Sequence, residues 1–182
     1  PTKGAANSGA PTISPNDLLV SEVNYDNNST DYYEYSEVTN TTDHPIDFAA
    51  YGLTLTKSGT AMTLHDSADT TKTSPTVDPV IPAHGTQIFW WVENQYFGVK
   101  TTSQFLSNYG LPSSTPVVLA YGFSSLGNSG GDHSYYLSVN AGGSALVSRA
   151  YVDTPCAANT FNGASVCPAT NNNSAEHYAV PA

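Results

Sequence analysis

Between residues 34 and 55, polar and apolar side chains alternate on either side of a polar, proline-containing turn. The first half of this stretch carries Glu34, Tyr35 and Glu37 and directly follows two further tyrosines, Tyr32 and Tyr33. Its second half carries the apolar residues Ile46, Phe48, Tyr51, Leu53 and Leu55. Side chains that alternate in this way belong to strands that bury one face. The stretch therefore predicts two short strands joined by a turn at residues 40–45.

The same kind of pattern recurs along the chain. Further strands are predicted at residues 17–25, 60–64, 86–92, 116–121, 134–140, 145–152 and 175–180. In the first of these, strict alternation places Leu19, Ser21 and Val23 on one face. Residues 101–110 begin with two threonines and end in a glycine, which predicts one short helix. The pattern indicates an all-β chain with a single helix.

Several of these segments resemble the bacterial lamin-tail domain. They are Leu-Val-Ser-Glu-Val at 19–23, Pro-Ile-Asp-Phe at 45–48, Val-Ile-Pro at 80–82 and Val-Ser-Arg-Ala-Tyr at 147–151. Their order and spacing run from about residue 17 to residue 180, and they are similar to the N-terminal modules of secreted metallophosphoesterases. The resemblance implies an immunoglobulin-like antiparallel β-sandwich of the lamin-tail type.

Ser36 departs from this pattern, because lamin-tail domains usually carry a bulky apolar residue there. Either a neighbouring tyrosine fills the space, or the strand is shifted by one residue and its two faces are exchanged.

The domain is expected to comprise residues 17–182. Residues 1–16 consist almost entirely of small and polar side chains, so they form a flexible N-terminal arm or one that docks on a neighbouring copy. A mature secreted protein would begin in this way after removal of its leader.

Charge excludes one class of partner. Five Lys and Arg stand against fifteen Asp and Glu, which gives a net charge of -10. Most of the surface would repel a phosphate backbone, so nucleic-acid binding is not expected. The chain has no apolar run of the ~18 residues that a membrane-spanning helix requires.

Cys156 and Cys167 stand near the C-terminus with ten residues between them. A metal site needs further ligands close by, and the sequence places none there. We therefore predict a disulfide, which would stabilise the fold by about 3 kcal/mol and indicates an oxidising, extracellular location.

The sequence offers two kinds of modification or ligand site, and both include Asn28. Asn28, Asn40 and Asn172 each begin a glycosylation acceptor tripeptide. Asp26, Asn28 and Thr30 have the spacing of a calcium loop, although Asp31 stands where such a loop needs glycine. The sequence therefore favours a solvated turn, with calcium as the alternative, and no cofactor is expected.

No catalytic constellation emerges. The segment Gly-Asn-Ser-Gly-Gly-Asp at 127–132 resembles a serine-protease nucleophile loop, but the histidines lie at the wrong spacing for a triad. These histidines are expected on the surface. Glu22, Glu34 and Glu37 are expected on exposed strand faces, where no apolar pocket would raise a carboxyl pKa. The chain is thus predicted not to be an enzyme.

Tyrosines offer the remaining candidate site. They are Tyr32, Tyr33, Tyr35, Tyr135 and Tyr136. Neighbours on a strand point to opposite faces, so about half of these rings should reach the surface, where they suit contacts with protein or carbohydrate. The alternative is that they are ordinary core and surface rings.

These observations predict a non-enzymatic, secreted structural or interaction module. It could assemble with copies of itself into a filament or surface layer, through strand edges or the N-terminal arm. The alternative is an accessory module of a secreted metallophosphoesterase or nuclease whose catalytic part lies beyond residue 182.

Overall fold

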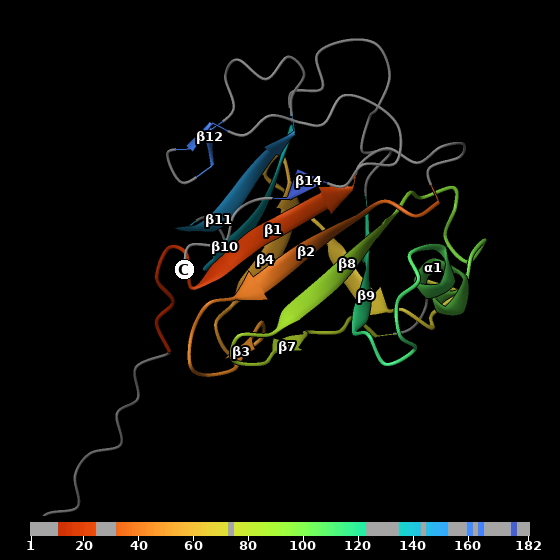
Figure 1. Ribbon diagram of the computed structural model, residues 1–182, viewed down its shortest axis with the longest axis horizontal. Coiled ribbons are helices and arrows are strands. Elements are labelled where there is room, and N and C mark those ends of the chain that lie inside the picture. The colour runs from red at the N-terminus through yellow and green to blue at the C-terminus, as the bar shows by residue number, and fades with distance from the viewer. Residues whose placement is uncertain are drawn as a thin grey trace, which may run out of the picture.

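The computed structural model describes residues 11–24, 32–72, 75–122, 135–142, 145–152, 160–161, 164–165 and 176–177. In this part the chain is mostly β-structure with one short helix (Figure 1), which confirms the coarse fold prediction. No helix among these residues is both long and apolar enough to cross a bilayer.

The larger sheet has six strands in the order β14-β1-β2-β8-β9-β6. Their bounds are Glu176–His177 (β14), Leu18–Asn24 (β1), Tyr35–Asn40 (β2), Thr86–Val92 (β8), Val117–Tyr121 (β9) and Thr63–Asp66 (β6). All neighbours pair antiparallel except β8 and β9, which are parallel. Parallel neighbours need a crossover connection, and here the crossover contains the helix α1 (Thr102–Asn108). The parallel pair therefore places α1 against the sheet, at the right of Figure 1.

The second sheet has four strands in the order β11-β10-β4-β5. Their bounds are Ala145–Val152 (β11), Tyr135–Ala141 (β10), Leu53–Lys57 (β4) and Thr60–Ala61 (β5). Two small ladders complete the described β-structure. They are β3 (Ile46–Asp47) with β7 (Val80–Ile81), and β12 (Thr160–Phe161) with β13 (Ala164–Ser165).

The segment at residues 34–55 contributes to three sheets. Its first half is β2, while its second half is divided into β3 and β4. The expected single second strand is therefore wrong. The strand is interrupted after Asp47 because the Asp47 carboxylate accepts hydrogen bonds from the backbone N–H groups of Ala49 and Ala50. These bonds turn the chain. Gly52 then adopts a positive φ of 59°, a conformation that suits glycine.

Alternation in β1 is interrupted by a bulge between Val20 and Glu22. Val20 pairs with Val38, and beyond the bulge Val23 pairs with Ser36. The extra residue shifts the register, so Val20 and Val23 both join the main core. The expectation that Leu19, Ser21 and Val23 share one face fails for this reason.

Ser36 is fully buried and faces the main core. The indole Nε1 of Trp91, on the neighbouring β8, donates a hydrogen bond to the Ser36 hydroxyl over 2.9 Å. The large side chain beside Ser36 is therefore a tryptophan from the adjacent strand and not a tyrosine. The faces of β2 are not exchanged, since Val38 remains in the same core.

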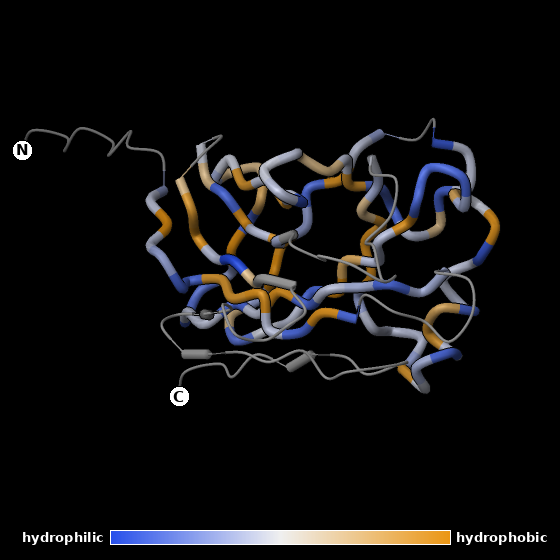
Figure 2. The backbone as a smooth tube through the Cα atoms, turned by 90° about the horizontal axis from the view of Figure 1, so that it is seen from above, coloured by the Kyte–Doolittle hydropathy of each residue, from blue (hydrophilic) through white to orange (hydrophobic). Residues whose placement is uncertain are grey.

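The main core lies between the two large sheets and draws on both. Phe89 and Trp91 come from one sheet, and Leu55, Leu137 and Val139 come from the other. Along the strands, the tube in Figure 2 changes repeatedly between apolar and polar residues. A second, smaller cluster lies between the other face of the six-stranded sheet and α1. The six-stranded sheet is thus covered on two sides.

Residues 11–16, at the end of the predicted arm, lie against the domain. Ile13 packs on the main core, and the backbone N–H of Asn16 donates to the carbonyl of Val147 over 3.0 Å. Residues 1–10 lie outside the described part of the chain.

The Asn40 side chain links the end of β2 to the turn at His44 and to the end of β7. Its side-chain nitrogen lies 2.8–3.1 Å from the carbonyl oxygens of His44, Ile81 and Pro82, while its Oδ1 accepts from the N–H of Thr42. The residue is fully buried. A glycan would need that nitrogen exposed, so the folded domain gives no access to the acceptor tripeptide at this position.

We predict that Asn40→Ala lowers the free energy of unfolding by about 3 kcal/mol, because buried carbonyls lose their donor. Urea denaturation followed by circular dichroism measures this loss. The matched control is Asn108→Ala, an exposed asparagine, for which we expect a change within about 0.5 kcal/mol. Equal stability of the two variants would contradict the assignment of Asn40 as an anchor.

Candidate interaction surface

The helix α1 begins with a capping box. The Thr101 hydroxyl accepts from the N–H of Gln104 over 3.3 Å, and the Gln104 Oε1 accepts from the N–H of Thr101 over 2.9 Å. Neither the first nor the last turn carries a charge that complements the helix dipole. These local contacts, together with packing, therefore hold this short helix.

Helical spacing separates the helix into two faces. Phe105 and Leu106 are buried against the sheet. The outward side carries Ser103, Gln104, Ser107 and Asn108, all of them exposed. The exposed face thus offers hydroxyl and amide groups and no charge.

Beneath the helix, aromatic rings pack edge to face or tilted. The Phe105 ring centroid lies 4.9 Å from that of Trp90 and 5.2 Å from that of Tyr109. Tyr35 lies 4.9 Å from Tyr109 in a T-shaped pair. Such pairs add about 0.5–1.5 kcal/mol beyond the buried area, so the cluster firmly fixes the helix on the sheet.

The same cluster holds the segment that precedes β2. The indole N–H of Trp90 donates to the carbonyl of Tyr32 over 2.8 Å, and the Tyr109 hydroxyl donates to the carbonyl of Tyr33 over 2.6 Å. These two bonds place the rings of Tyr32 and Tyr33 beside the helix, where both remain partly exposed. The Lys100 ammonium lies 4.7 Å from the Tyr32 ring centroid.

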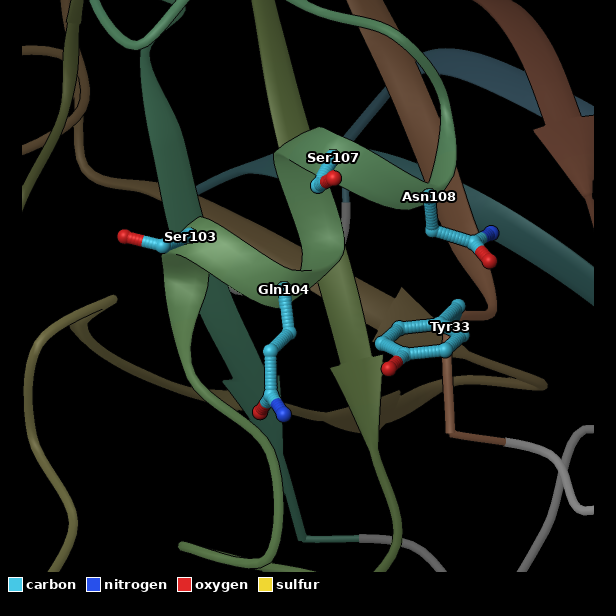
Figure 3. A pocket seen from close by; sticks show the side chains of 5 residues that line it. All are labelled: Tyr33, Ser103, Gln104, Ser107 and Asn108. Carbon is cyan, nitrogen blue, oxygen red and sulfur yellow. The ribbon is translucent and has the colours of Figure 1, made fainter.

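A hollow of about 470 Å³ opens between the helix and Tyr33. It is lined by Tyr33, Ser103, Gln104, Ser107 and Asn108, which we call the helix-face surface. Figure 3 shows that Gln104 and Asn108 extend from the helix on either side of the Tyr33 ring, while Ser103 points away from it. The lining combines one aromatic face with two amides that can each donate and accept hydrogen bonds.

A second hollow, of about 510 Å³, lies on the other side of the helix. Ser103 and Ser107 line both hollows, and Leu106 and Leu111 add apolar surface to the second. The two hollows therefore form one continuous uncharged region across α1.

The structure separates the five tyrosines singled out from the sequence. Tyr33 lines the helix-face surface, and the Tyr32 ring lies next to it, with the two ring centroids 6.3 Å apart. Tyr35 is buried in the aromatic cluster and its hydroxyl donates to Glu22, so it offers no exposed ring. Tyr136 lies on the second sheet, where the Arg149 guanidinium stands 4.1 Å from its ring centroid. The side chain of Tyr135 lies outside the described part.

The four helix residues of this surface were missed by the sequence analysis. The signal was present, because residues 101–110 were predicted to be helical and a period of 3.6 places Ser103, Gln104, Ser107 and Asn108 on one face. Their uncharged character does not single them out, because charged residues make up only 11% of the chain.

His65 corrects the expectation that the histidines lie on the surface. It is buried, and its Nδ1 lies 3.1 Å from the buried carboxylate of Asp69. The turn after β6 brings Asp69 back to the strand, so the partner is not the sequence neighbour Asp66. His44 and His84 are exposed, as expected.

Glu34 was expected on an exposed strand face and is instead fully buried. Burial lowers the pKa of Lys57, while the charges of Glu34 and Glu93 act on that ammonium in the opposite direction. These groups form a charge cluster at the ends of β2, β4 and β8. Since Lys57 faces two carboxylates there, we interpret the cluster as structural.

The sequence also offered candidate metal, glycosylation and disulfide residues. Within the described residues, no group of three or more His, Cys, Asp or Glu side chains is arranged to hold a metal ion. The calcium-loop residues Asp26, Asn28 and Thr30 lie outside these residues, as do Asn172 and the predicted disulfide between Cys156 and Cys167.

The aromatic cluster predicts sensitivity to alkali. Burial raises the pKa of Tyr35, and its hydrogen bond to Glu22 acts in the same direction. Burial also raises the pKa of Tyr109, aided by the charge of Glu34. Below the unfolded tyrosine pKa of about 10, both states are protonated and stability is complete. Above it the unfolded chain loses protons that the folded chain retains.

We therefore expect the free energy of unfolding to fall as the pH rises beyond about 10, by at most about 1.4 kcal/mol per pH unit for each hydroxyl. Urea titrations between about pH 8 and about pH 12 measure the slope. Tyr35→Phe and Tyr109→Phe should each reduce it. A double variant that keeps the wild-type slope would refute the explanation.

The sequence matches no protein-family model, and no curated protein is similar enough to it to serve as a relative. The helix-face surface must therefore be interpreted from its own chemistry.

Proposed function

We propose that this chain is a secreted, non-enzymatic interaction module built on the lamin-tail type of immunoglobulin-like β-sandwich. The fold assignment is supported by two sheets that share one core. It is also supported by the positions of the segments that carry the resemblance: residues 19–23 lie in β1, and residues 147–151 lie in β11. An extracellular location is supported by the predicted disulfide.

The observation that carries the interaction role is the helix-face surface. In a chain with a net charge of -10, none of the residues that line this surface is charged. The Lys100 ammonium lies beside it, 5.9 Å from the Tyr33 ring centroid. Tyr, Ser and Asn are enriched in antibody binding loops, and charged residues are depleted at the centres of protein interfaces. The partners consistent with this surface are a second copy of the chain, another protein or a carbohydrate.

Packing makes the surface suitable for recognition. Backbone carbonyls of Tyr32 and Tyr33 are held by Trp90 and Tyr109, and the helix is fixed by Phe105. A surface that is already ordered loses less conformational entropy when a partner binds. Rigid rings beside adaptable amides therefore favour binding over a purely solvent-facing role.

Photo-crosslinking tests this proposal. The amino acid p-benzoylphenylalanine replaces Ser107 in the full chain, which is then illuminated with the extracellular material of the cells that produce it. We expect specific adducts from this position. The matched control carries the same group at Val80, which is 53% exposed on β7 and lies outside the helix-face surface.

If Ser107 gives no more adduct than Val80, the proposed role of this surface is refuted. Light scattering and negative-stain microscopy, with and without calcium, then assign the adducts. Filaments or a defined oligomer would identify the partner as another copy of the chain, whereas a strict monomer would assign the adducts to a different molecule.

A further inference from the structure

We propose that the helix-face surface binds a neutral polysaccharide chain. This inference rests on the proposed interaction function and specifies its ligand. The site consists of Tyr33, Gln104 and Asn108, with Ser103 and Ser107 between the two hollows. Each part of it corresponds to a chemical feature of a sugar.

The first feature is the apolar face of a pyranose ring, which packs on aromatic rings. Tyr33 is partly exposed, and its carbonyl accepts a hydrogen bond from the Tyr109 hydroxyl over 2.6 Å. Behind it the ring stacks on Trp90, with centroids 6.4 Å apart and planes 28° apart. Since Tyr33 is held from behind, its ring can serve as a platform at low entropic cost.

The second feature is the set of free hydroxyls that sugar units carry. Each of these hydroxyls donates and accepts, and so does each side-chain amide. Gln104 is oriented in advance, because its Oε1 is held by the N–H of Thr101 and its NH₂ group remains as a donor. Asn108 provides a second amide on the other side of the Tyr33 ring (Figure 3). The ring is thus flanked by amides in the arrangement that a stacked sugar requires.

The third feature is neutrality. None of the residues that line either hollow carries a charge, and the Lys100 ammonium, 5.9 Å from the Tyr33 ring centroid, lies outside the lining. The chain as a whole has fifteen acidic against five basic side chains, and this excess would repel a carboxylated or sulfated chain. A ligand without charge meets neither this repulsion nor the cost of burying an unpaired ion.

The fourth feature is length. The hollows measure about 470 and 510 Å³, and both fall within the range of about 300–1,000 Å³ found for small-ligand sites. Because Ser103 and Ser107 line both, successive sugar units can occupy the two hollows across the helix. A polymer therefore fits this region better than a single sugar does.

Calorimetric titration of the full chain tests the proposal. The probes are the neutral hexasaccharides chitohexaose, cellohexaose, maltohexaose and mannohexaose, with hexagalacturonate as the charged counterpart. We expect at least one neutral probe to bind with a Kd between about 10 μM and about 1 mM, as suits an open site. Hexagalacturonate should not bind.

Variants locate the binding. Tyr33→Ala should weaken it at least about tenfold, and Asn108→Asp about threefold or more. The matched control is Tyr136→Ala, a tyrosine on the second sheet, which should leave the affinity unchanged. If Tyr33→Ala proves misfolded by circular dichroism, amide chemical-shift changes in the wild-type chain decide: they must cluster at residues 101–110 when the probe is added.

Absence of binding by all four neutral probes, equal binding of hexagalacturonate, or loss of binding in Tyr136→Ala alone would each overturn the proposal. Failure of the ligand assignment differs from failure of the proposed function. In the first case Ser107 still gives more photo-adduct than Val80 while no neutral probe binds. In the second case the two positions give equal adduct.

Discussion

The central strand β8 is buried on both faces, and most of the structure depends on this constraint. Every residue from Gln87 to Val92 is buried. Phe89 and Trp91 enter the main core, while Trp90 and its neighbours two residues away enter the cluster under α1. A strand with two apolar faces must be covered on both. The second sheet covers one face, and the helix, which the parallel connection to β9 places outside the sheet, covers the other.

Trp90 connects this constraint to the helix-face surface. Its ring packs on Phe105 of α1, and its indole N–H donates to the carbonyl of Tyr32. One core side chain thus positions the helix and the tyrosine segment relative to each other. The exposed hollow between Tyr33 and Gln104 is thus a consequence of how the sheet is covered.

The elements that alternate clearly or carry local signals were predictable. Residues 86–92 and 145–152 form strands as expected, and Thr101 and Gly110 flank the helix. The sequence predictions failed at residues whose side chain bonds to the backbone or whose partner lies far away in the sequence. Asp47 breaks a strand through its own carboxylate, while Asn40 binds carbonyls about forty residues away. Glu34 was expected on the surface because Lys57, which lies far from it in the sequence, is brought near only by the fold. His65 was expected there because the turn that returns Asp69 to the strand was not predicted. For the same reason, the composition of α1 was visible from the sequence, but its position beside Tyr33 was not.

The distribution of charge gives the final argument for a function at α1. Surface helices are usually kept soluble by charged residues on their outer face, often in pairs four residues apart. In α1 the corresponding positions are Ser103 with Ser107 and Gln104 with Asn108. These residues contribute little to helix stability, and Ser and Asn are less favourable in a helix than Lys or Glu would be. The helix instead depends on its capping box and on burial of Phe105 and Leu106. Folding therefore does not require these particular exposed residues, and their lack of charge agrees with the binding of an uncharged partner that we propose.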